Sequence, residues 1–65
     1  MENFTENHLR QIVKHRSNKY PTYKLGRLLV NKPAHQVWEY VDERTKCSVM
    51  VEYKIKNNRL TKKSV

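Results

Sequence analysis

Three histidines and one cysteine are the residues of this 65-residue chain that could form a zinc site or pair a thiol nucleophile with a histidine base. His8 and His15 lie two helical turns apart, whereas paired ligands on one helix face lie three or four residues apart. Cys47 is the single cysteine, so no disulfide can form within the chain. It alternates with Val49 and Val51, which predicts a small core residue rather than a reactive thiolate. We expect no metal site; a zinc site of His8, His15 and Cys47 is the weaker alternative.

Carboxylates and glycines give no enzyme signature either. Glu39, Asp42, Glu43 and Glu52 could pair as general acid and base, but solvated hairpin positions that balance neighbouring bases explain them more simply. The single glycine excludes a glycine-rich phosphate loop. The length is about half that of a typical domain, too short for a cleft between two lobes. We expect a small protein that is not an enzyme and uses no cofactor.

Basic residues dominate the composition, with 14 Lys and Arg against 6 acids and a net charge of +8. Residues 8–32 hold seven bases and no acid, and residues 54–65 hold five bases and no acid. Such segments attract phosphate polymers, acidic proteins or anionic surfaces, although a solvated face that only keeps the protein soluble is the simpler alternative. The bases that we nominate for binding are Arg10, Lys14, Arg16, Lys19, Lys24, Arg27, Lys32, Lys54, Lys56, Arg59, Lys62 and Lys63.

The first element that positions these bases is a helix predicted from Asn3 to Ser17. Asn3 followed by Glu6 fits a capping box. Pro21 bars continuation, because the residue before a proline avoids the helical region. The apolar stripe of this helix is narrow and consists of Leu9, Ile12 and Val13.

Three strands are predicted to follow. Residues 23–30 form the first, with Gly26 marking a bulge, and residues 47–56 alternate cleanly between apolar and polar. Residues 34–42 fit a helix or a strand, and the strand is preferred because 47–56 needs a hairpin partner. The expected fold is α+β, with one N-terminal helix packed on a three-stranded antiparallel meander. Residues 1–56 would form this single domain, and residues 57–65 a basic, flexible tail.

The sequence does not determine which face of this sheet is exposed. Val37 lies on one side of the strand at 34–42, and Trp38 and Tyr40 lie on the other. If the aromatic side is exposed, Trp38 and Tyr40 form a patch with Met50 and Lys54 that could stack on unpaired bases or anchor a protein partner. The alternative places both aromatics in the core. An open sheet could also pair in a homodimer.

Two short motifs resemble the double-stranded-RNA-binding domain over residues 9–56. Pro21-Thr22-Tyr23-Lys24-Leu25 is similar to the P-x-Y-x-L that opens that family's first strand, and Pro33-Ala34-His35 resembles the P-x-H of its following loop. The resemblance implies that Lys32 and His35 contact an RNA minor groove. It also implies that Lys62-Lys63 stand where the basic cluster of the family's second helix begins.

Two binding functions are therefore expected. The first is a small module that binds DNA or RNA through one contiguous basic surface. The alternative is a phage-type regulator or inhibitor, from a phage or another low-GC genome, that docks on an acidic surface of a larger host protein. No apolar run approaches a membrane span and no targeting segment is evident, so we expect a cytoplasmic protein without a membrane partner.

Overall fold

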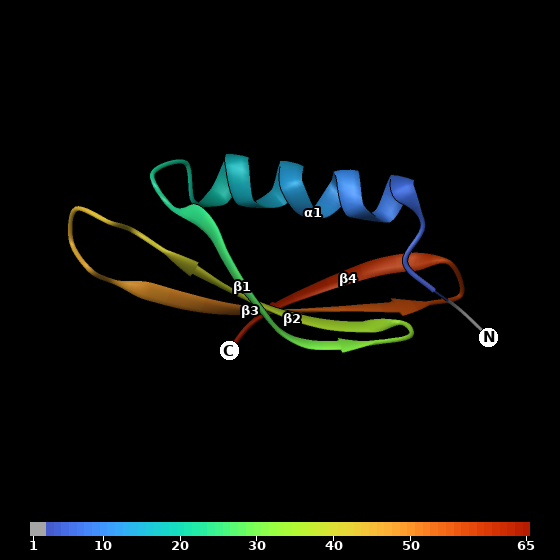
Figure 1. The fold of residues 1–65 in the computed structure, drawn as a ribbon. Coiled ribbons are helices and arrows are strands. Elements are labelled where there is room, and N and C mark those ends of the chain that lie inside the picture. The colour runs from blue at the N-terminus through green and yellow to red at the C-terminus, as the bar shows by residue number, and fades with distance from the viewer. Residues whose placement is uncertain (1–2) are drawn as a thin grey trace.

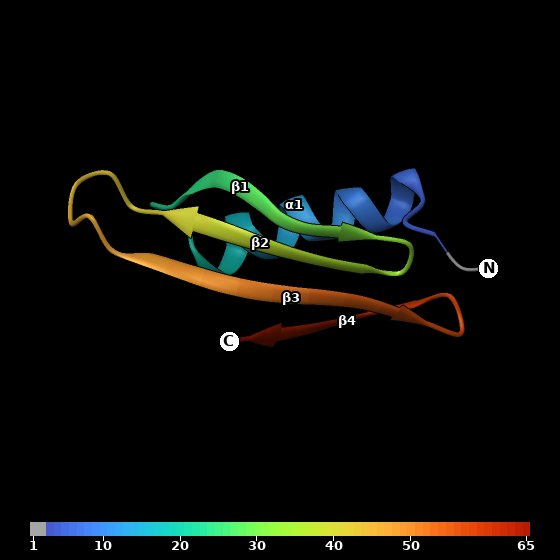
Figure 2. The same ribbon diagram turned by 60° about the horizontal axis from the view of Figure 1, so that its bottom comes forward.

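One helix followed by four strands makes up the computed structural model, which describes residues 3–65. The elements are α1 (Glu6–Lys19), β1 (Lys24–Lys32), β2 (His35–Val41), β3 (Ser48–Lys56) and β4 (Arg59–Ser64). The strands form one antiparallel sheet in the order β1-β2-β3-β4. Helix α1 covers one face (Figure 1), and the other face is uncovered (Figure 2). The predicted α+β meander is confirmed, and residues 35–41 are a strand rather than a helix.

Helix α1 begins at a different cap from the predicted one. The N-cap is Thr5, whose side chain accepts a hydrogen bond from the backbone N–H of His8 at 3.3 Å. The Nδ1 atom of His8 accepts a hydrogen bond from the Thr5 backbone N–H at 3.1 Å, so His8 takes the capping-box position expected for Glu6.

Among residues 3–65, the structure contains no helix with the length and apolar character that a membrane span requires.

The C-terminal segment is part of the sheet. Residues 59–64, predicted as part of a tail, form β4, which pairs with β3 along its whole length. Asn57 and Asn58 both have positive φ (52° and 62°), as the two central residues of a type I′ hairpin turn require. The sheet therefore has four strands instead of three.

The aromatic residues all lie on the helix side of the sheet. Tyr40, Tyr53, Ile12 and Val51 form the buried cluster. The half-buried rings packed against it are Phe4, Tyr20, Tyr23 and Trp38. Burial of this side removes large apolar surfaces from water and supplies most of the stabilisation available to so small a domain. The sequence left open whether Trp38 and Tyr40 are exposed or lie in the core. In the structure they lie on the core side.

A hydrogen-bonded chain of side chains crosses this core. The Tyr40 and Tyr53 hydroxyls are 2.6 Å apart, and the Tyr53 hydroxyl lies 2.9 Å from Nδ1 of His15. Burial is the main cause that raises the pKa of both tyrosines, so both hydroxyls are neutral. The network satisfies polar atoms that would otherwise be costly to bury.

Strand β1 departs from simple alternation at two bulges. Its register with β2 shifts between Leu25 and Arg27 and again between Leu28 and Val30. A Cβ atom at Gly26 would collide with the backbone carbonyl oxygen of Glu39, which explains the glycine. Because of the second bulge, Leu28 and Val30 oppose Trp38 and Val37 on different faces, although a regular strand would place them on the same face.

Cys47 corrects another expectation. It is exposed and precedes β3, rather than being a small core residue. Within residues 3–65, no group of three His, Cys, Asp or Glu residues is placed to hold a metal ion.

Candidate nucleic-acid interface

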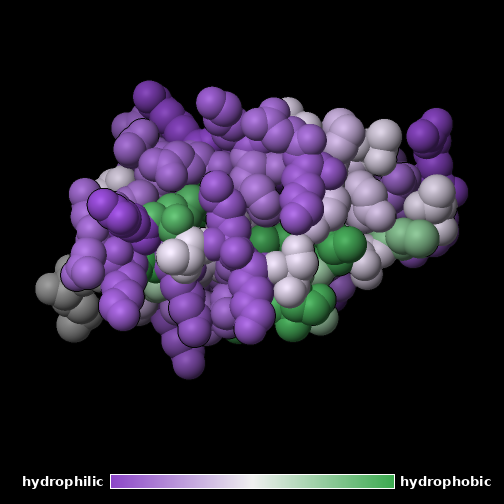
Figure 3. All heavy atoms as spheres, turned by 180° about the vertical axis from the view of Figure 1, so that it is seen from behind, coloured by the Kyte–Doolittle hydropathy of each residue, from purple (hydrophilic) through white to green (hydrophobic). Residues whose placement is uncertain are grey.

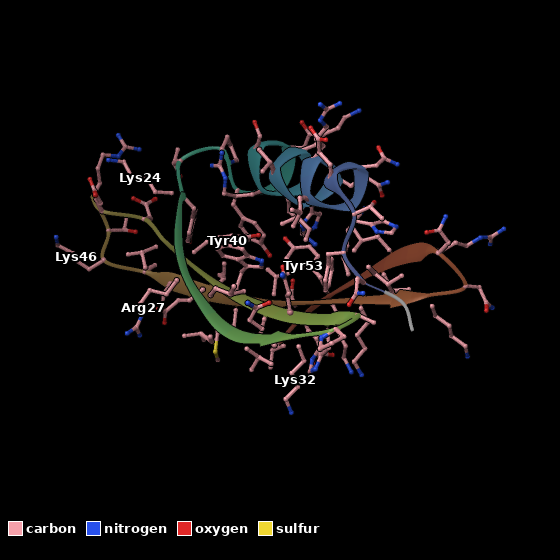
Figure 4. All side chains as sticks on the ribbon, turned by 45° about the vertical axis from the view of Figure 1, so that its right-hand side comes forward. Lys24, Arg27, Lys32, Tyr40, Lys46 and Tyr53 are labelled. Atoms are coloured by element: carbon pink, nitrogen blue, oxygen red, sulfur yellow. The ribbon has the colours of Figure 1, made fainter. Side chains whose placement is uncertain are left out.

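The sheet face away from α1 carries most of the nominated bases. Directly opposed residues of antiparallel strands share a face, so the register places Lys32, His35 and Lys54 in one row across β1, β2 and β3. In Figure 4, Arg27 and Lys32 point away from the helix, whereas Tyr40 and Tyr53 lie between helix and sheet. We call this uncovered side the open face. Its nominated residues are Lys24, Arg27, Lys32, His35, Lys54, Lys56, Arg59 and Lys63.

Ion pairs engage some of these bases. Lys24 Nζ lies 3.2 Å from a carboxylate oxygen of Glu43 in the β2–β3 loop. Arg27 Nη2 lies 3.2 Å from Glu39 on the neighbouring strand, an exposed pair that contributes little stability. These two pairs offset the charges of Lys24 and Arg27, the nominated bases nearest the β2–β3 loop.

The opposite end of the open face keeps its positive charge. We call its bases the basic end, which consists of Lys32, Lys54, Lys56, Arg59 and Lys63. It begins where the β1–β2 and β3–β4 turns reach the same edge of the molecule (Figures 1 and 2) and extends inward to Lys63, which lies opposite Glu52. No carboxylate of residues 3–65 forms an ion pair with Lys32, Lys56, Arg59 or Lys63. Lys56 and Arg59 oppose each other across the turn and line a hollow of about 550 Å³ with Asn57 and Thr61.

Glu52 is the acid within this basic end. Its Oε2 lies 2.9 Å from Nε2 of His35, and its Oε1 lies 3.8 Å from Nζ of Lys54. The His35 hydrogen bond, followed by the positive charges of Lys54 and Lys63, outweighs desolvation and holds the pKa of Glu52 below its usual value. Glu52 is therefore ionised near neutral pH, and it occupies the ring nitrogen that His35 could otherwise offer to a ligand.

The centre of the open face is apolar but not aromatic. Val30 and Val37 oppose each other there, and Met50, opposite Glu39, is 40% exposed. All six aromatic rings belong to the helix side, so the open face offers cations and aliphatic groups but no stacking platform. The patch expected from Trp38, Tyr40, Met50 and Lys54 does not exist, because Tyr40 is fully buried and the latter two lie on the opposite face.

A second group of bases lies on the other side of β4. Lys14 and Lys19 of α1 and Lys62 of β4 line one hollow between these elements. Figure 3 shows this side of the molecule, where hydrophilic side chains gather over α1 and β4 with smaller apolar patches between them. The nominated bases therefore form two groups separated by the edge strand, not the single contiguous surface expected from the sequence.

Two nominated arginines belong to neither group. Arg10 lies on the outer surface of α1 and pairs with Glu6 at 2.8 Å. Arg16 donates from Nη1 to the backbone carbonyl of Tyr23 at 2.7 Å, so it joins the helix to the segment before β1. Two bases that sequence reasoning did not nominate, Arg44 and Lys46, are exposed in the β2–β3 loop. Arg44 and Lys46 were overlooked because the neighbouring acids Asp42 and Glu43 offset their positive charges in the net charge of that segment.

The resemblance to the double-stranded-RNA-binding domain is supported only at the level of an N-terminal helix and an antiparallel sheet. Lys62 and Lys63, which the resemblance places at a helical basic cluster, lie in β4 on opposite faces of the sheet. His35, placed by the resemblance in a loop, is the first residue of β2. Comparison of the chain with protein-family models, curated proteins and solved structures finds no match.

Proposed function

We propose that the protein binds nucleic acid by placing the basic end of its open face against backbone phosphates. The observation that carries this proposal is the grouping of Lys32, Lys56, Arg59 and Lys63 at one end of an uncovered sheet, without ion-pair partners among residues 3–65. Unpaired cations on one surface release counterions when they meet a phosphate chain, and this release drives salt-dependent binding.

The chemistry of the open face favours duplex over single-stranded nucleic acid. Sequence-tolerant single-strand binding relies on aromatic side chains that stack on unpaired bases. The open face supplies no such ring, and the groups that it offers to nucleic acid are cations suited to backbone phosphates. Phosphate contacts position a protein on a duplex without reading its sequence, so we expect weak sequence preference.

A salt titration tests the proposal. Fluorescence anisotropy would follow binding to mixed-sequence duplex DNA, duplex RNA and a single strand between about 50 and about 200 mM salt. The double variant Lys56→Gln/Arg59→Gln should make the log–log salt slope shallower by roughly 1.8 for duplexes, because each lost phosphate contact removes about 0.9. Arg10→Gln is the matched control, since Arg10 is exposed but paired with Glu6 away from the open face. Binding that ignores salt, or an equal loss in both variants, would contradict the proposal.

A protein-binding regulator is the second candidate, and the outer side of α1 favours it. Leu9 and Val13 are 41% and 47% exposed and line a hollow of about 490 Å³ together with Arg10 and Lys14. Exposed apolar groups beside bases suit an acidic amphipathic partner. Val13→Asp would abolish such an interaction and leave duplex binding unchanged, whereas the Lys56→Gln/Arg59→Gln variant would do the reverse.

A further inference from the structure

The hollow between α1 and β4 has a different composition from the rest of the surface. Its volume is about 290 Å³, and its lining residues are Gln11, Lys14, His15, Asn18, Lys19 and Lys62. Every one of these side chains can donate a hydrogen bond, and none is a carboxylate. No ion pair in residues 3–65 involves Lys14, Lys19 or Lys62. The hollow therefore concentrates positive charge that the protein itself does not neutralise.

His15 forms the inner wall of this hollow and is fixed in place. Its Nδ1 lies 2.9 Å from the Tyr53 hydroxyl, and its ring packs edge-on against Tyr53 and Tyr20 at 5.7 and 6.2 Å between centroids. When Nδ1 of neutral His15 accepts a hydrogen bond from the Tyr53 hydroxyl, the ring proton lies on Nε2, which then acts as a donor. Burial, followed by the charges of Lys62 and Lys19, lowers the pKa of His15, so the ring is neutral near pH 7.

We infer that this α1–β4 hollow binds a phosphate group. The three lysines supply the positive charge, the amides of Gln11 and Asn18 supply neutral donors, and the ring of His15 forms part of the lining. A phosphate oxyanion matches this set, because it carries up to two negative charges and accepts several hydrogen bonds at once. The site is distinct from the basic end and does not depend on it.

The phosphate group has two possible sources with the same chemistry. One is a free phosphate or a small phosphorylated compound, for which a hollow of this volume has room. The other is a backbone phosphate of nucleic acid that passes over β4, because Lys62 and Lys63 place charges on the two faces of that edge strand. The same spectroscopic measurement separates these sources.

The test is an NMR titration of the His15 ring in the full chain. Inorganic phosphate, a nucleoside 5′-monophosphate and a duplex oligonucleotide would be added separately, and the pKa of His15 would be measured with each. A bound anion offsets the repulsion from Lys62 and Lys19 and should raise the pKa of His15. A response to inorganic phosphate or the nucleotide identifies a free ligand, and a response to the oligonucleotide alone identifies a backbone phosphate.

Lys62→Gln and Lys63→Gln make a matched pair of variants. The two lysines are adjacent and exposed on β4, but only Lys62 lines the hollow. Lys62→Gln should weaken phosphate binding about tenfold, as expected for one charge-assisted contact, while Lys63→Gln leaves it unchanged. A His15 pKa that no ligand shifts, or equal responses in the two variants, would overturn the inference. Loss of duplex binding in Lys56→Gln/Arg59→Gln with an intact His15 response to inorganic phosphate would support both sites separately. A His15 response to inorganic phosphate in a protein that binds no duplex would contradict the proposed function alone.

Discussion

The two faces of the sheet divide the chemistry of the chain between them. Val51 on the helix side is fully buried, while Met50, the preceding residue of the same strand, is 40% exposed on the open face. The helix side holds all six aromatic rings, and the open face holds cations and a few aliphatic groups. A chain this small therefore uses its large apolar side chains for stability and is left with charge as its means of recognition.

The largest effect expected from this contrast is on stability. Val51→Ala should lower the free energy of unfolding by about 2–3 kcal/mol, because two buried methyl groups are lost and a cavity remains. Met50→Ala, the neighbouring control, should change it by no more than about 0.5 kcal/mol. Urea denaturation followed by Trp38 fluorescence measures both. Similar losses in the two variants would mean that the open face is covered or packed in solution.

Removal of a single hydroxyl from the helix side should have the next largest effect. Tyr53→Phe leaves the buried Tyr40 hydroxyl and Nδ1 of His15 without their partner, at a cost of about 1–3 kcal/mol. Tyr23→Phe is the control, since Tyr23 packs against the same core and the hydrogen bonds found for it within residues 3–65 involve its backbone. Thermal unfolding by circular dichroism compares the two. An equal change in melting temperature would show that the hydroxyl chain is not important for stability.

A smaller effect is expected from protonation of His15. Its pKa is lower in the folded protein than the ordinary value of 6.5, so the unfolded chain binds the proton more tightly. Stability should therefore be highest above pH 6.5 and fall as pH drops from there through the folded pKa. His15→Gln should flatten this part of the profile. The later loss at more acidic pH, caused by Asp42 and Glu52 with their lowered pKa values, should persist in that variant. An unchanged slope below pH 6.5 in His15→Gln would contradict the assignment.

The smallest effect should come from the turn beside the basic end. Ala34 has a φ of 61°, a left-handed conformation that costs a residue with a Cβ about 1–2 kcal/mol. Ala34→Gly removes this strain but adds backbone entropy to the unfolded chain, so a net gain of about 0.5 kcal/mol is expected. Duplex binding should not change. A destabilised variant would indicate that the Ala34 methyl group contributes packing that outweighs the strain.

The sequence was most informative where a strand has one apolar face. Alternation over 47–56 predicted β3 almost to the residue, and the hairpin argument correctly chose a strand for β2. It could not determine which face of β2 is buried, because valines and aromatics compete for the core. The position of α1 over Tyr40 and Tyr53, which is a tertiary effect, decides this.

Strand β4 was missed because its own residues carry almost no strand signal. Leu60 is its one apolar residue, and the rest of Arg59-Leu60-Thr61-Lys62-Lys63-Ser64 resembles a charged tail. The available clue was Asn57-Asn58, a residue pair that suits a two-residue hairpin turn after a clear strand. The candidate site suffered from the same omission, because β4 separates Lys62 from Lys63 and so divides the bases into two groups.

The same edge strand has a consequence for the behaviour of many copies in solution. Every side chain of β4 except Leu60 is exposed, and two adjacent lysines, Lys62 and Lys63, lie on this outermost strand. If a second copy extended the sheet by hydrogen bonding to β4, its own lysine ammonium groups would lie close to Lys62 and Lys63 and repel them. At the opposite margin, the bulges of β1 interrupt the straight template that such extension needs. The molecule should therefore resist fibril formation at high concentration and lose that resistance when Lys62 and Lys63 are both neutralised.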